Sequence, residues 1–88
     1  MFNIYHYHHW SDCSAIVVAT SQVLPGGYTA ETAAEAANVF VLIGYKKTLA
    51  EAIDYARRCA AEIGGDFKEY QSKLPTVDGS AVLFELKK

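Results

Sequence analysis

The chain of 88 residues has few cysteines, no basic residue in its first half and no long apolar run. Two cysteines, Cys13 and Cys59, are fewer than small extracellular domains usually need to compensate for a small core. We therefore expect two free thiols and a cytoplasmic protein. An apolar content of 51% with 20% charged residues excludes a disordered or fibrous chain.

Basic residues are confined to the second half, because no Lys or Arg precedes Lys46. Residues 1–45 contain three acidic residues and no basic one, and the whole chain has a net charge of −2. Nucleic-acid affinity depends on basic side chains that neutralise phosphates, so a nucleic-acid partner is not expected. The basic residues available for such a contact are Lys46, Lys47, Arg57 and Arg58.

The longest unbroken aliphatic or aromatic run covers only residues 39–43, whereas a membrane span needs about 20 residues. The N-terminus lacks a basic start followed by an apolar stretch, so neither a signal peptide nor a membrane partner is expected. The length predicts a single domain over residues 1–88, since separate cores need longer chains.

Four segments have the composition of β-strands. Residues 2–9 are rich in aromatic and β-favouring types, and residues 15–20 follow a polar break, so together they predict an N-terminal hairpin. Residues 66–72 and 80–87 predict two further strands, with Asp78 and Gly79 supplying the turn chemistry between them.

The clearest helix covers residues 48–63. Thr48 and Glu51 match the Ser/Thr-x-x-Glu capping box, and the glycines at 64 and 65 end the helix. Its apolar face is predicted to consist of Leu49, Ala52, Ile53, Ala56, Cys59, Ala60 and Ile63.

A second helix is predicted to begin at Thr29, in an alanine-rich segment. Its end is open to two interpretations, because residues 39–43 have strand composition whereas Gly44 is suitably placed to end a helix. We favour the longer helix. The fold class is then α+β, a two-layer domain with an antiparallel sheet of four strands and two helices on one face; the alternative adds a fifth strand.

All three histidines lie close together near the N-terminus. On a strand His6 and His8 would point to the same face, as two zinc ligands could. Zinc needs further ligands, for which Asp12 and Cys13 are the nearest suitable residues. A metal site at His6, His8, Asp12 and Cys13 is therefore the alternative hypothesis, and no other cofactor is expected.

Aromatic residues are abundant, with six Tyr and one Trp. Tyrosine and tryptophan are over-represented at binding hot spots. No convincing catalytic set accompanies them, so we expect a non-enzymatic protein-interaction domain, similar in size and composition to small accessory or phage-type inhibitory proteins that act by occupying a surface. Its partner would be another protein or a second copy in a homodimer, bound along a sheet edge. The predicted contact residues are Tyr5, Tyr7, His9 and Trp10.

Overall fold

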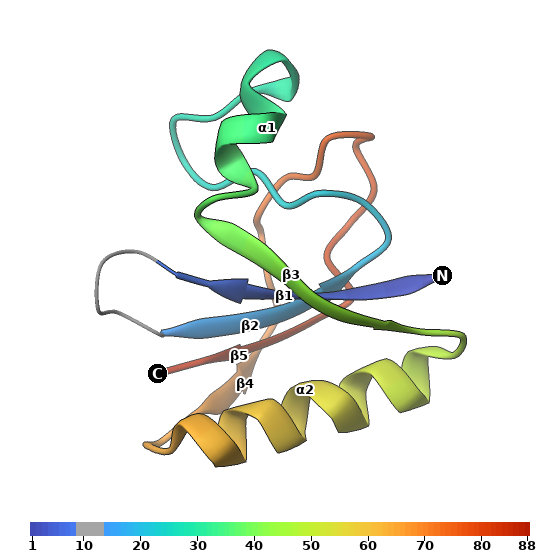
Figure 1. Cartoon of the computed structure of the whole chain (residues 1–88), viewed down its shortest axis with the longest axis vertical. Helices are drawn as coiled ribbons and strands as arrows, with labels where there is room; N and C mark the ends of the chain where they lie inside the picture. The colour runs from blue at the N-terminus through green and yellow to red at the C-terminus, as the bar shows by residue number, and fades with distance from the viewer. Residues whose placement is uncertain (9–13) are drawn as a thin grey trace.

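The computed structural model describes residues 1–8 and 14–88, and these form a five-stranded antiparallel sheet with two helices (Figure 1). The elements are, in chain order, β1 (Phe2–Tyr7), β2 (Ala15–Ala19), the 3₁₀ turn η1 (Ala30–Thr32), α1 (Ala33–Ala36), β3 (Phe40–Lys46), α2 (Leu49–Ile63), β4 (Lys68–Tyr70) and β5 (Phe84–Lys87). The predicted α+β class with an antiparallel sheet is confirmed. Within the described residues, no helix combines the length and apolar character needed to cross a membrane.

The strands lie side by side in the order β3-β1-β2-β5-β4. β1 and β2 form the predicted hairpin, with Asn3 opposite Ala19 and His6 opposite Ile16. β1 also pairs with β3, so both of its sides are hydrogen-bonded to neighbours. The two outer strands are therefore β3 and β4.

Residues 40–46 form a strand, so the longer helix from Thr29 is wrong and the five-strand alternative is correct. Helical structure in this part of the chain is limited to η1 and α1, which together cover residues 30–36. The β-branched and aromatic residues that follow are suited to a pleated surface, and β1 offers them a partner. Non-local pairing with β1 therefore outweighs the local helix signal.

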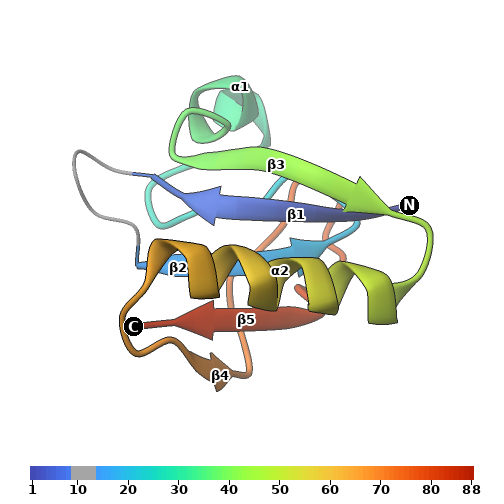
Figure 2. The same cartoon turned by 60° about the horizontal axis from the view of Figure 1, so that its bottom comes forward.

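α2 covers one face of the sheet and runs along the strands, as Figure 2 shows. Thr48 caps it as predicted, since the backbone N–H of Glu51 donates to Thr48 Oγ1 at 3.2 Å and Thr48 Oγ1 donates to Glu51 Oε1 at 2.9 Å. The small side chains of Ala52, Ala56 and Ala60 are buried and let the helix approach the sheet closely. They pack on a core cluster completed by Ile4, Ile16, Val18 and Leu86.

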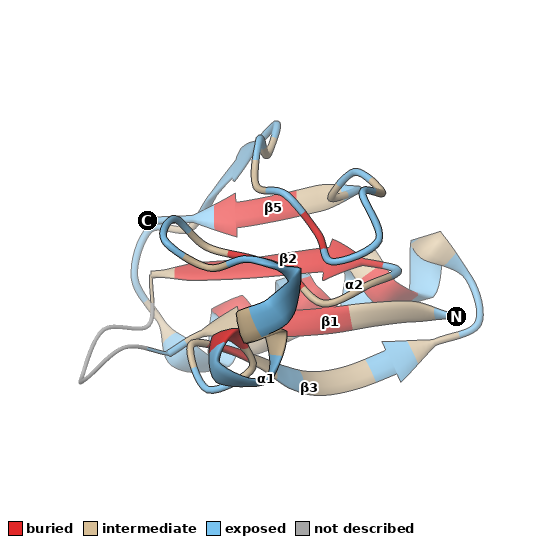
Figure 3. Cartoon of the chain, turned by 90° about the horizontal axis from the view of Figure 1, so that it is seen from above, coloured by how far each residue is buried: buried red, intermediate tan, exposed pale blue. Residues whose placement is uncertain are grey.

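The opposite face is covered by two loops, residues 20–28 and 71–83, and α1 lies on this side of the molecule, away from α2 (Figure 1 and Figure 3). The expectation that both helices share one face is therefore not met by α1. The loops are tied together by backbone bonds from Leu24 N to the Pro75 carbonyl at 2.8 Å and from Val77 N to the Gln22 carbonyl at 2.9 Å. Beneath them lies a second core cluster made of Tyr5, Ala15, Val17, Ala19, Val23 and Phe40.

Candidate functional site: a free strand edge and a hollow beside it

The predicted N-terminal contact strip does not form an open surface. Tyr5 is only 4% exposed and belongs to the second core cluster, and Tyr7 is half-buried against the same cluster. Because β1 lies between β2 and β3, no partner strand can be added to it. The other two predicted contact residues, His9 and Trp10, lie outside the described residues.

Tyr5 instead acts as a core residue whose polar end is satisfied locally. Its hydroxyl accepts a hydrogen bond from Asn3 Nδ2 at 3.2 Å. Burial raises the pKa of the phenol above its ordinary value, because charged phenolate would be poorly solvated there. The aromatic content of this strand thus contributes to the core on the face opposite α2.

His6 and His8 do lie beside each other, as the alternation on a strand predicts. Their ring centroids are 6.1 Å apart in an edge-to-face arrangement. Nε2 of His6 is buried and has no hydrogen-bond partner within residues 1–8 and 14–88. Burial, and then the neighbouring His8, lower the pKa of His6.

A complete metal site is not formed by the residues that the structure describes. Among them, no three His, Cys, Asp or Glu side chains are grouped closely enough to hold a metal ion. Asp12 and Cys13, which were predicted to complete the zinc site, lie outside the described residues. Cys59 packs half-buried against the first core cluster, and burial raises the pKa of its thiol, which disfavours the reactive thiolate.

The basic residues of α2 are paired with carboxylates. Arg57 Nη2 lies 2.6 Å from Glu69 Oε1, and Arg58 Nη2 lies 2.8 Å from Asp54 Oδ2. These two arginines therefore have their charge balanced locally, which gives no support to a phosphate-binding patch on this helix.

β3 presents a different kind of surface, because it is a seven-residue outer strand with exposed apolar side chains. Leu42 is 51% exposed and Tyr45 is 61% exposed. Edge strands are usually protected from association by being short, charged, bulged or covered. Within β3 the only charged residue is Lys46, at its end.

Two contacts hold β3 onto α2. The hydroxyl of Tyr55 donates to the carbonyl oxygen of Ile43 at 3.0 Å, and the Lys46 ammonium lies 5.1 Å from the centre of the Tyr55 ring. A β-bulge sits at the same point of the strand, because Ile4 pairs with Gly44 whereas Tyr5 pairs with Leu42. Ile43 is thus the extra residue, and it packs against the α2-side core.

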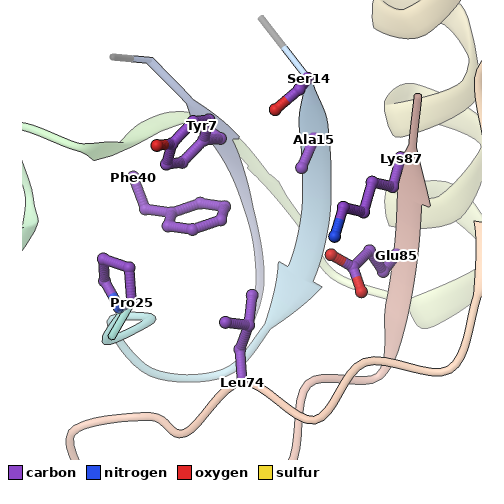
Figure 4. A pocket seen from close by; sticks show the side chains of 8 residues that line it. All are labelled: Tyr7, Ser14, Ala15, Pro25, Phe40, Leu74, Glu85 and Lys87. Atoms are coloured by element: carbon purple, nitrogen blue, oxygen red, sulfur yellow. The ribbon is translucent and has the colours of Figure 1, made fainter. Parts of the chain in front are cut away.

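A hollow of about 280 Å³ opens on the face opposite α2, between the two covering loops (Figure 4). Its apolar walls come from Tyr7, Ala15, Pro25, Phe40 and Leu74. The Tyr7 and Phe40 rings contact each other, with centroids 5.3 Å apart.

Charged side chains of β5 line the other side of the hollow. Glu85 and Lys87 both extend toward it from this strand (Figure 4). Glu85 is only 7% exposed, and no hydrogen bond or ion pair to its carboxylate is formed by the described part of the chain. Lys87 is exposed at the rim.

Comparison with known proteins adds no information on function. The chain matches no protein family, no curated protein and no solved structure. The functional assignment therefore depends on the geometry of the β3 edge and of the hollow.

Sequence reasoning missed the residues that characterise both features. Leu42 and Tyr45 were placed in or next to a helix end, although the alternative strand for residues 39–43 would have indicated them. Glu85 alternates with the apolar Phe84 and Leu86, which is typical of a strand with a solvent-exposed face. The apolar Leu83, on the same side of the alternation as Glu85, is the one local signal that this face is partly covered.

Proposed function

We propose that the chain is a non-enzymatic protein-interaction domain that adds an extended strand of another chain to the free edge of β3. The observation that carries this proposal is the contrast between the two outer strands. β4 has three residues, two of them charged, and is protected in the way natural edges usually are. β3 has seven residues and exposes Leu42 and Tyr45, so it is suited to strand addition.

The exposed apolar side chains lie on one side of this edge. Leu42 is opposite Tyr5, and Tyr45 is opposite Asn3, so both point to the face away from α2. Gly44 is opposite Ile4 on the α2 face. A strand placed beside β3 would therefore contact Leu42 and Tyr45 with side chains on that same face.

A second copy of this chain fits the edge best. In an antiparallel pair related by a two-fold axis, residues opposite each other must point to the same face. Pairing Leu42 with the second copy's Tyr45 satisfies this rule on the face away from α2. The same register places Val41 opposite the second copy's Lys46 on the α2 face, since these residues pair with His6 and Phe2 of β1.

The bulge explains why this register is favoured. The extra residue Ile43 shifts the alternation between Leu42 and Tyr45, so that both side chains share a face although they are three positions apart. Opposite a strand without a bulge, only one of these two side chains would have an opposite residue that points to the same face. Opposite the same bulge in a second copy, both are matched.

The test is sedimentation equilibrium of the full chain over a range of concentrations. We expect a concentration-dependent dimer, and we expect Leu42→Lys to be monomeric, because it places two charges in the paired edge. Leu83→Lys is the matched control, since Leu83 is 43% exposed and lies outside β3. An unmodified chain that stays monomeric, or a Leu42→Lys variant that dimerises normally, contradicts the proposal.

A second candidate function is metal binding by His6 and His8. The buried, unbonded Nε2 of His6 supports it, because such an atom usually has a partner. The test is elemental analysis of untagged protein purified without a nickel column, followed by thermal melts with added zinc. Stoichiometric zinc, lost in His6→Gln, supports this function, whereas metal-free protein that zinc does not stabilise rejects it.

A further inference from the structure

We propose that the hollow opposite α2 binds a small organic cation, namely an ammonium group carried on a compact apolar or aromatic body. The inference is independent of strand addition at β3. It depends on Glu85, on the aromatic wall facing it, and on the limited volume between them.

The carboxylate of Glu85 provides the main argument. The residue is only 7% exposed. Within residues 1–8 and 14–88 its carboxylate has neither a hydrogen-bond donor nor an ion pair. Its oxygens reach the open hollow without a partner from these residues, so they are free to accept hydrogen bonds from a ligand there. An ammonium group in the hollow would supply both the opposite charge and the missing donors.

The rest of the hollow favours an apolar body on that cation. Phe40, Tyr7 and Leu74 form its walls, and the face of an aromatic ring attracts cations. The volume of about 280 Å³ lies just below the range of about 300–1,000 Å³ that is typical of small-molecule sites. A ligand the size of a single ring with a short amine arm is therefore suitable.

Lys87 is the group that competes with such a ligand. It lines the same hollow, and Figure 4 shows its ammonium directed toward Glu85. Lys87 is exposed, however, and contacts between exposed ionic side chains contribute little to stability, so it can turn to solvent when a ligand enters.

The wider hollow next to it has the opposite character. It shares Leu74, Glu85 and Lys87 with the first hollow, and adds Lys73 and Lys88. An anion would therefore be drawn to this outer, basic side. The sign of the ligand's charge thus distinguishes binding at Glu85 from binding at the lysines.

The experiment is an NMR titration of the unmodified chain with three probes of similar shape: 2-phenylethylamine, 2-phenylethanol and 3-phenylpropionate. We expect saturable shifts with the amine at the Ala15 and Leu74 amides, and affinity at least about tenfold weaker for the alcohol. Equal binding of amine and alcohol, tighter binding of the propionate, or no saturation with the amine would each overturn the proposal.

A pair of variants tests the carboxylate itself. Glu85→Gln keeps the shape but removes the charge, and it should weaken 2-phenylethylamine at least about tenfold. Glu69→Gln is the control, since Glu69 is exposed on β4, and it should bind the amine like the unmodified chain. Unchanged affinity in Glu85→Gln contradicts the proposal. If that variant fails to fold, the three probes on the unmodified chain decide the question.

Discussion

The hydroxyl end of the Tyr55 ring occupies the space beside Gly44 that a Cβ atom would need, where α2 meets the bulge of β3. A Cβ atom at residue 44 would come within 3.0 Å of Tyr55 Cζ and 3.1 Å of its hydroxyl oxygen. The ring cannot easily move away, because its hydroxyl donates to the Ile43 carbonyl at 3.0 Å. Glycine at this position therefore lets α2 hold the bulged edge strand in place.

The first prediction concerns this contact. Gly44→Ala should destabilise the fold by about 1–3 kcal/mol through overpacking. In a double-mutant cycle by chemical denaturation, adding Tyr55→Leu should recover part of that loss, since the smaller side chain frees the space. A Gly44→Ala variant as stable as the unmodified chain would show that the ring moves without cost.

The second prediction concerns the alanine face of α2. Ala56 is fully buried against the sheet, whereas Ala61 on the same helix is exposed. Ala56→Leu should therefore lower the free energy of unfolding by about 1–3 kcal/mol. The same substitution at Ala61 should change it by no more than about 0.5 kcal/mol. Thermal melts that do not separate the two variants would contradict the assignment of the core face.

The third prediction compares two tyrosines with opposite roles. Tyr5→Ala removes a side chain that is 4% exposed and should cost about 3–5 kcal/mol, as other large aromatic truncations do. Tyr45→Ala removes one that is 61% exposed and should change the stability of the monomer by no more than about 0.5 kcal/mol, while weakening dimerisation. Urea denaturation at low protein concentration measures the first effect, and sedimentation the second. A stable Tyr5→Ala variant would place Tyr5 at the surface after all.

The fourth prediction follows from the lowered pKa of His6, caused by burial and by His8. Below its ordinary value of 6.5 the unfolded chain binds more protons at this residue than the folded chain, so stability falls as the pH falls through that range. His6→Leu should therefore lose less melting temperature than the unmodified chain between about pH 7.5 and about pH 5.

The loss of stability at lower pH, caused by protonation of Asp78, provides the control for that experiment. Asp78 accepts hydrogen bonds from Ser80, which lower the pKa of its carboxyl, so its contribution is lost only as the pH falls below about 4. The decrease in melting temperature below about pH 4 should be the same in His6→Leu and in the unmodified chain. If the melting temperatures of the two proteins instead fall in parallel between about pH 7.5 and about pH 5, the pKa of His6 does not differ between the folded and the unfolded chain.

Local signals were sufficient to predict α2 and the hairpin of β1 and β2. The capping residues of α2, its alanine stripe and the alternating aromatic strand each act over a few positions. Residues 39–43 were assigned incorrectly because their strand depends on pairing with β1, more than thirty positions away. Local composition cannot report whether such a partner is available.

For the candidate site, the sequence predicted only which side chains of β1 lie on the same face of the sheet. Tyr5 and Tyr7 do share a face, and so do His6 and the apolar Ile4. The burial of Tyr5 and the hollow at Glu85 depend on residues 20–28 and 71–83, which are joined by backbone hydrogen bonds on the face away from α2. These loops have no periodic pattern, so neither the burial of Tyr5 nor the hollow at Glu85 follows from the sequence.

The most direct test of the central claim is amide hydrogen exchange along β3, measured at high and low protein concentration. Pairing with a second copy predicts slower exchange near Leu42 and Tyr45 at high concentration, lost in Leu42→Lys. The β4 amides near Glu69, at the other edge of the sheet, should exchange equally at both concentrations and serve as an internal control. Exchange along β3 that does not depend on concentration would contradict strand addition by a second copy.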